Sequence, residues 1–135
     1  MTIELRLDRT ATMAQTVHIR GHQLVADVSE TEGGGDTGPS PHDLYDAALG
    51  ACKALTVMWY ARRKGIPVDD IQTQVERDDA DERKGIYRLT TVLKVHGDLS
   101  DAQLKELEAV AGKCPVHKLM TTVTTEITTR MERLP

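Results

Sequence analysis

The segment from Pro41 to Lys64 constrains the fold most, because it predicts one uninterrupted helix of about 24 residues. Ser40 can cap its first turn, and Gly65 followed by Pro67 ends it. Its apolar residues recur at helical spacing: Leu44, Ala47, Ala48, Ala51, Leu55, Met58 and Trp59. A helix of this length is about 36 Å long, enough to cross a small domain. The rest of the chain must therefore be arranged around it.

The remaining segments predict an α+β fold, because strand patterns stand on both sides of the long helix. Strands with alternating or β-branched patterns are expected at residues 3–8, 14–19, 22–28, 68–77 and 85–96. Ser100 and Gln103 form a capping-box pattern at the start of a second helix, which Gly112 ends. Pro115 can open a short third helix. The sequence TTVTTEITT predicts a closing strand at residues 121–129.

Size and charge narrow the classes of protein to which this chain can belong. A chain of 135 residues with 39% hydrophobic and 28% charged residues predicts a single domain over residues 1–135. No apolar run approaches the roughly 20 residues of a membrane span, and the N-terminus lacks the apolar core of a secretory signal, so we expect a cytoplasmic protein. A net charge of −4 argues against a nucleic-acid partner. Three Tyr, one Trp and no Phe predict a lean core, which favours a dimer.

The candidate chemistry lies with two cysteines, Cys52 in the predicted long helix and Cys114 near the predicted third helix. In a cytosolic chain such a pair is not evidence for a structural disulfide. Cys52 lies on an Ala-rich face, where a small core residue is an equally good interpretation. Cys114 directly precedes Pro115, with Lys113 and His117 beside it. Local electrostatics therefore favour Cys114 as the thiol with the lower pKa.

A metal site is the alternative interpretation of the same residues. Cys114 and His117 could supply half of such a site, and Cys52 and His42 the other half. Two ligands at this spacing are a weak signal without a second paired motif. The triple glycine at residues 33–35 lacks the lysine ending of a phosphate-binding loop. The sequence therefore predicts neither a metal ion nor a cofactor.

Three stretches together resemble the OsmC/Ohr family, and more narrowly its OsmC-like branch: GPSPHDL at residues 38–44, AALGAC at 47–52 and KCPVH at 113–117. The likeness extends over most of the chain, from about residue 14 to residue 129. The two cysteine contexts, each in its expected element, make it specific. The resemblance implies an OsmC-like fold, with a curved antiparallel sheet and a long central helix, in an intertwined homodimer.

The resemblance also implies thiol-dependent reduction of organic hydroperoxides. In the family, the cysteine of the long helix attacks the peroxide and becomes a sulfenic acid, which assigns that role to Cys52. The second cysteine, here Cys114, resolves the sulfenic acid as an intramolecular disulfide, and a dithiol reductant restores both thiols. For these roles the family pattern outranks the electrostatic comparison of the two cysteines, because a nearby cation can activate Cys52 in three dimensions.

The chain departs from the family at the activating pair, an arginine of the N-terminal hairpin and a glutamate ten residues before the reactive cysteine. The arginine position corresponds best to Arg20, whereas the glutamate position is His42, with Asp43 beside it. A histidine cannot hold a guanidinium with the bidentate geometry of a carboxylate. The alternatives are therefore an OsmC-like redox sensor or a binder of an apolar small molecule, and third a zinc-stabilised structural module.

Overall fold

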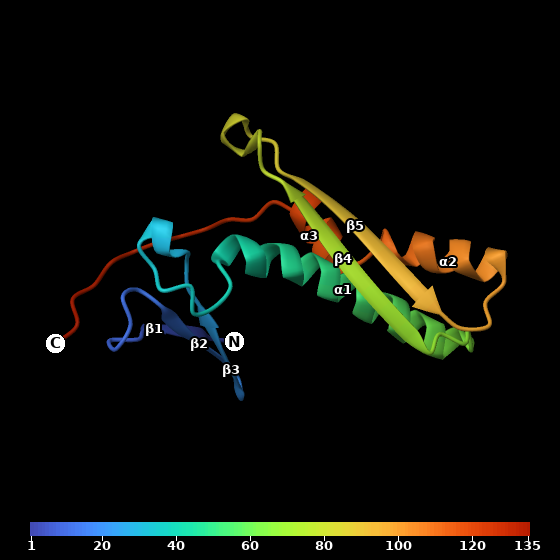
Figure 1. Ribbon diagram of the computed structural model, residues 1–135, viewed down its shortest axis with the longest axis horizontal. Helices are drawn as coiled ribbons and strands as arrows, with labels where there is room; N and C mark the ends of the chain where they lie inside the picture. Colours follow the sequence, from blue (N-terminus) through green and yellow to red (C-terminus); the bar gives the residue numbers. More distant parts are fainter. The chain divides into compact units, whose positions relative to one another are not determined.

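The computed structural model describes all 135 residues and confirms the α+β class (Figure 1). The elements in chain order are β1 (Ile3–Leu7), β2 (Gln15–Ile19), β3 (His22–Ala26), η1 (Glu30–Glu32), α1 (Pro41–Lys64), β4 (Asp70–Asp78), η2 (Glu82–Lys84), β5 (Arg88–His96), α2 (Asp101–Ala111) and α3 (Pro115–Thr121). The strands form two antiparallel sheets, one of β1, β2 and β3 and one of β4 and β5. No helix is both long and apolar enough to span a membrane.

The chain forms two compact units, each built from two separate segments. The first unit comprises residues 1–50 and 74–92, and the second comprises residues 51–73 and 93–135. The division falls inside α1, β4 and β5, which contribute residues to both units. It therefore does not test the prediction of one domain over residues 1–135.

The first unit contains the three-stranded sheet, in which the strands expected at residues 14–19 and 22–28 pair as a hairpin. Ile19 pairs with His22 across the two-residue turn Arg20–Gly21, and Ile3 of β1 pairs with Ile19 from the other side. Arg20 has a φ of 54°, a left-handed value that costs a residue with a side chain about 1–2 kcal/mol. The strand pairing on either side of this tight turn holds Arg20 in that conformation.

The buried carboxylate of Asp27 organises the Gly-rich loop between β3 and α1. Its Oδ1 accepts a hydrogen bond from the Val28 N–H at 2.8 Å. Its Oδ2 accepts from the Gly35 N–H at 3.2 Å and from the N–H and hydroxyl of Thr37 at 3.0 and 2.7 Å. A Cβ on Gly34 would lie 2.3 Å from the Val28 carbonyl oxygen, so only glycine fits there. The loop is thus closed around one side chain.

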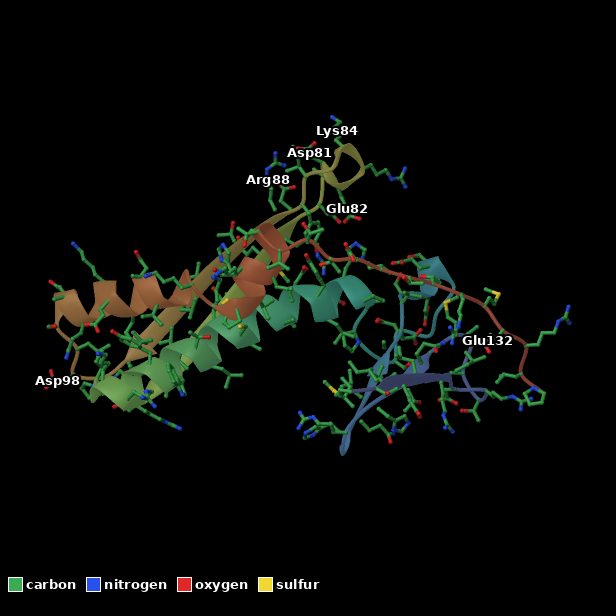
Figure 2. All side chains as sticks on the ribbon, turned by 180° about the vertical axis from the view of Figure 1, so that it is seen from behind. Asp81, Glu82, Lys84, Arg88, Asp98 and Glu132 are labelled. Atoms are coloured by element: carbon green, nitrogen blue, oxygen red, sulfur yellow. The ribbon has the colours of Figure 1, made fainter.

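The tip of the β4–β5 hairpin, also in the first unit, is charged. Figure 2 shows Asp81, Glu82, Lys84 and Arg88 gathered around η2. Arg88 Nη1 lies 2.7 Å from Asp81 Oδ2, and both side chains are partly exposed. An ion pair this accessible to water adds little stability.

The second unit has its own hydrophobic core, in which the C-terminal half of α1 packs against α2. Its buried members are Val57, Ala61, Ile66, Leu107 and Ala111. The predicted capping box starts α2, because the Gln103 N–H donates to the Ser100 hydroxyl oxygen and the Ser100 N–H donates to the Gln103 side-chain oxygen. Gly112 ends that helix as predicted. The bounds predicted for α1 are also confirmed.

The apolar pattern on which the long helix was predicted is not the face that the chain buries. On the face that the chain buries, Leu49, Lys53, Val57 and Ala61 are spaced four residues apart. Leu55 and Trp59 are instead 70% and 61% exposed, and Ala47, Ala48 and Ala51 are exposed as well. The helix thus carries two stripes, and the chain covers only one of them.

The closing strand predicted at residues 121–129 is wrong. Thr121 ends α3, and residues 123–135 have no regular secondary structure. The Thr121 and Thr122 hydroxyls donate to the carbonyl oxygens of His117 and Lys118, at 2.8 and 3.0 Å. Ile127 is 82% exposed. A β-branched sequence becomes a strand only where a neighbour packs against it, and here the first threonines bond back to the preceding helix.

Candidate thiol site

The site lies in the second unit, where the connection between α2 and α3 is short. Only two residues, Gly112 and Lys113, separate the end of α2 from Cys114, which is the N-cap residue of α3. The Cys114 sulfur accepts a hydrogen bond from the His117 N–H at 3.4 Å. Pro115 occupies the first helical position, as predicted. Cys114 is fully buried.

Cys52 reaches the same turn from α1. Its sulfur accepts a hydrogen bond from the backbone N–H of Val116 at 3.4 Å. Both cysteines are free thiols, Cys52 half-buried and Cys114 buried. Residues 62 positions apart in the sequence are therefore neighbours, and each sulfur accepts an N–H from the turn at residues 115–117. Of the two, only Cys52 is open to a molecule from solution.

The prediction of a lowered pKa for Cys114 is wrong. Burial raises the pKa of the Cys114 thiol, and the neighbouring Cys52 sulfur raises it further. The His117 N–H and the charge of Lys53 lower the pKa but do not compensate. Sequence alone shows that Cys114 precedes a helix but not that its sulfur is removed from water, and desolvation dominates here.

A buried lysine next to Cys52 completes the site. Lys53 is 4% exposed, and its Nζ lies 2.8 Å from the Ala111 carbonyl oxygen and 2.8 Å from His117 Nδ1. An ammonium group has only donors, so it donates to the Ala111 carbonyl oxygen and to His117 Nδ1. Sequence reasoning missed Lys53 because the helix was oriented by its other apolar stripe. The four-residue spacing of Leu49, Lys53 and Val57 was the signal that could have found it.

His42 and Asp43 lie in the first turn of α1, in the first unit. His42 Nε2 lies 3.0 and 3.1 Å from the two carboxylate oxygens of Glu82. Asp43 and Ser40 cap the helix reciprocally, each N–H donating to the other's side chain at 3.1 and 3.0 Å. Asp43 Oδ1 also accepts from Arg77 Nη2 at 2.7 Å. Two hydrogen bonds lower the pKa of Asp43: the larger effect comes from the Ser40 N–H and the next from the Arg77 side chain.

Arg77 of β4, in the first unit, is held by two carboxylates. Arg77 Nε lies 2.6 Å from Asp46 Oδ2, in addition to its bond to Asp43. The other Asp46 oxygen accepts from the Tyr87 hydroxyl at 2.7 Å. Burial and the bond to Asp46 raise the pKa of Tyr87 to about 12. Arg77 falls in a predicted strand and Asp46 in the predicted long helix. A charged residue in either element is typical of a solvated face, and so sequence reasoning singled out neither.

Arg20 is exposed in the turn between β2 and β3 and forms no ion pair within the first unit. Its role toward the thiol stays a prediction. The ligand set considered for a metal does not assemble, because no three His, Cys, Asp or Glu side chains are grouped closely enough to hold an ion. Of the predicted residues, the structure brings together the two cysteines.

The fold and the site define an α+β protein with two adjacent free thiols. A family model of OsmC-like proteins matches residues 33–130, so the chain belongs to the OsmC-like protein family. No curated protein sequence matches it.

Solved structures share the fold. An OsmC-like protein of Mycoplasma pneumoniae superposes with a TM-score of 0.71 at 20% identity, covering 90% of this chain and 87% of that one. The organic hydroperoxide resistance protein OsmC of Legionella pneumophila gives a TM-score of 0.63 at 18% identity, covering 90% and 88%. The organic hydroperoxide resistance protein OhrB of Bacillus subtilis gives a TM-score of 0.59 at 24% identity, covering 90% of each chain.

Proposed function

We propose that this protein is a thiol-dependent peroxidase that reduces organic hydroperoxides. The observation that carries the proposal is the unequal exposure of two adjacent free thiols, Cys52 half-buried and Cys114 buried. The partial exposure of Cys52 supports its role as the thiol that attacks a peroxide from solution, and the burial of the neighbouring Cys114 supports its role as the resolving thiol. The Legionella pneumophila and Bacillus subtilis proteins of the same fold, which are named for organic hydroperoxide resistance, support this class of substrate.

In the proposed reaction the Cys52 thiolate attacks one peroxide oxygen. The S–O bond forms as the O–O bond breaks, and the departing alkoxide takes up a proton and leaves as an alcohol. The Cys114 thiol then displaces the hydroxyl of the Cys52 sulfenic acid, forming an S–S bond and releasing water. A dithiol reductant finally reduces the disulfide and is itself oxidised to a disulfide.

The activating cation belongs to the proposal as well. We assign this role to Arg20, the position that the family pattern indicates. Its exposed side chain forms no ion pair in its own unit. Replacing Arg20 by Met should slow the oxidation of Cys52 by an organic hydroperoxide and leave thermal stability unchanged. An unchanged oxidation rate would remove Arg20 from the mechanism.

The experiment that tests the function is peroxide consumption by the reduced protein. Cumene hydroperoxide and hydrogen peroxide are offered separately, with dithiothreitol as the reductant. We expect repeated turnover, with cumene hydroperoxide the better substrate, and none in Cys52→Ser. Oxidation by one equivalent without further turnover would instead identify a redox sensor. No oxidation of either cysteine would overturn both functions.

We also propose that the protein acts as a homodimer. The exposed stripe of α1, defined by Leu55 and Trp59, is the observation in favour. Large apolar side chains adjacent on one helix face lose contact with water when a second copy covers them.

A further inference from the structure

The ammonium group of Lys53 is a buried charge without a carboxylate partner in its unit. Its two hydrogen-bond partners, the Ala111 carbonyl oxygen and His117 Nδ1, are both uncharged acceptors. The ion pairs of this unit join His96 to Asp69 and Arg130 to Glu132. A buried charge is ordinarily paired, because removing it from water costs several kcal/mol.

The groups around Lys53 indicate which anion would complete the pair. His117, whose side chain bonds to Nζ, also donates its backbone N–H to the Cys114 sulfur. The groups that act on Cys114 are the side chains of Cys52 and Lys53 on α1 and the backbone N–H of His117 on α3. The site thus contains one buried cation and two thiols, and a thiolate is the anion that these side chains can form.

We propose that Lys53 is a positioning residue for the resolving step, in which its ammonium group stabilises the thiolate of Cys114. This inference rests on the proposed peroxidase function. Cys114 loses a proton, and its electron pair forms the S–S bond to Cys52 as the S–O bond of the sulfenic acid breaks. The departing hydroxide takes up the proton that Cys114 lost, so the step yields one disulfide and one water.

The state of Cys114 explains why such a cation is needed. Burial raises the pKa of this thiol, whereas the positive charge of Lys53 lowers it. Without Lys53 the resolving thiol would be still less ionised near neutral pH. Resolution would then slow, and the Cys52 sulfenic acid would last long enough to be oxidised further.

The first test measures the pKa of Cys114 directly and needs no peroxide. The protein is labelled with ¹³C at the cysteine Cβ in a Cys52→Ser background, and the Cys114 resonance is followed against pH. We expect Lys53→Met to raise the Cys114 pKa by about one unit, a tenfold loss of thiolate below the pKa. Lys53→Arg, which keeps the charge, should retain most of the parent value. Lys105→Met removes an exposed lysine of α2 and should leave the pKa of Cys114 unchanged.

Lys53→Gln serves as a second variant that removes the charge, so the result does not depend on the folding of one substitution. A glutamine keeps N–H donors at the end of its side chain but carries no charge. A Cys114 pKa that is the same in the parent, Lys53→Met and Lys53→Gln would overturn the proposal. An equal rise in Lys53→Arg would also overturn it, because packing and not charge would then be the cause.

The second test follows resolution after one equivalent of cumene hydroperoxide, with both cysteines present. Dimedone trapping reports how long the Cys52 sulfenic acid survives. Lys53→Met should prolong it about threefold, because a more basic thiolate is also more nucleophilic and offsets part of the tenfold loss. An unchanged lifetime would contradict the role of Lys53 in resolution. If the protein does not react with peroxide at all, the proposed function fails, while the pKa measurement still decides the role of Lys53.

Discussion

Arg77 Nε lies 2.6 Å from Asp46 Oδ2, and this ion pair joins the first turns of α1 to strand β4. Asp46 is buried, and its other oxygen accepts a hydrogen bond from Tyr87. Asp43 holds the far side of the same guanidinium. The network has the residue types of an activating arginine–carboxylate pair, and its contacts within the first unit give it a structural role.

Replacing Arg77 by Met should lower the free energy of unfolding by about 1–3 kcal/mol, because the buried Asp46 carboxylate loses a charged donor. Urea unfolding followed by circular dichroism measures the change. The matched control is Arg88→Met, which breaks the accessible pair with Asp81 and should cost under about 1 kcal/mol. Equal losses in both variants would contradict the importance of burial at Asp46.

Oxidation with one equivalent of cumene hydroperoxide should join Cys52 to Cys114 within one chain. The two sulfurs already share the turn at residues 115–117, and the chain has no third cysteine. Peptide mapping of non-reduced protein measures the linkage. In Cys114→Ser the Cys52 sulfenic acid should accumulate and then oxidise further. Disulfides found only between chains would contradict the intramolecular step.

Most of the fold could be predicted because its signals are local. The caps of α1 and α2 involve residues three positions apart, and the turn at Arg20–Gly21 is bracketed by strand patterns on both sides. The closing strand could not be predicted reliably, since the same threonines satisfy either a strand or the end of a helix. Burial of one helix stripe and not another depends on contacts far along the chain.

The candidate site could likewise be predicted only in part from the sequence. The family pattern identified Cys52 and Cys114, and the structure places them together. The sequence alone did not single out the buried Lys53. A lysine is usually exposed, and its burial here depends on how the neighbouring helices pack. For the same reason the pKa of Cys114 was predicted in the wrong direction, since its burial depends on the packing of α1 and α2.

Acid should weaken the loop between β3 and α1. Hydrogen bonds, led by that from the Thr37 N–H, lower the pKa of Asp27 to about 2 from an ordinary value of 3.8. A lowered carboxylate pKa contributes stability above the unfolded-state pKa, and that stability is lost as the pH falls from about 4 to about 2. The difference in unfolding free energy between the parent and Asp27→Asn should therefore be constant from pH 5 to 7 and shrink below about pH 4. A difference independent of pH would contradict the assignment.

The exposed stripe of α1 should hold two copies of the chain together. Leu55 and Trp59 are 70% and 61% exposed. The guanidinium carbon Cζ of Arg63 lies 4.9 Å from the centroid of the Trp59 ring. A stable dimer buries roughly 1,200–2,000 Å² in total, and a central aromatic side chain commonly carries much of its energy. Light scattering should therefore report a dimer at micromolar concentration for the parent protein and a monomer for Leu55→Glu with Trp59→Glu. Leu104→Glu changes an exposed apolar residue of α2 and should leave the mass dimeric. A monomeric parent would contradict the homodimer, and a dimeric double variant would place the interface on another surface.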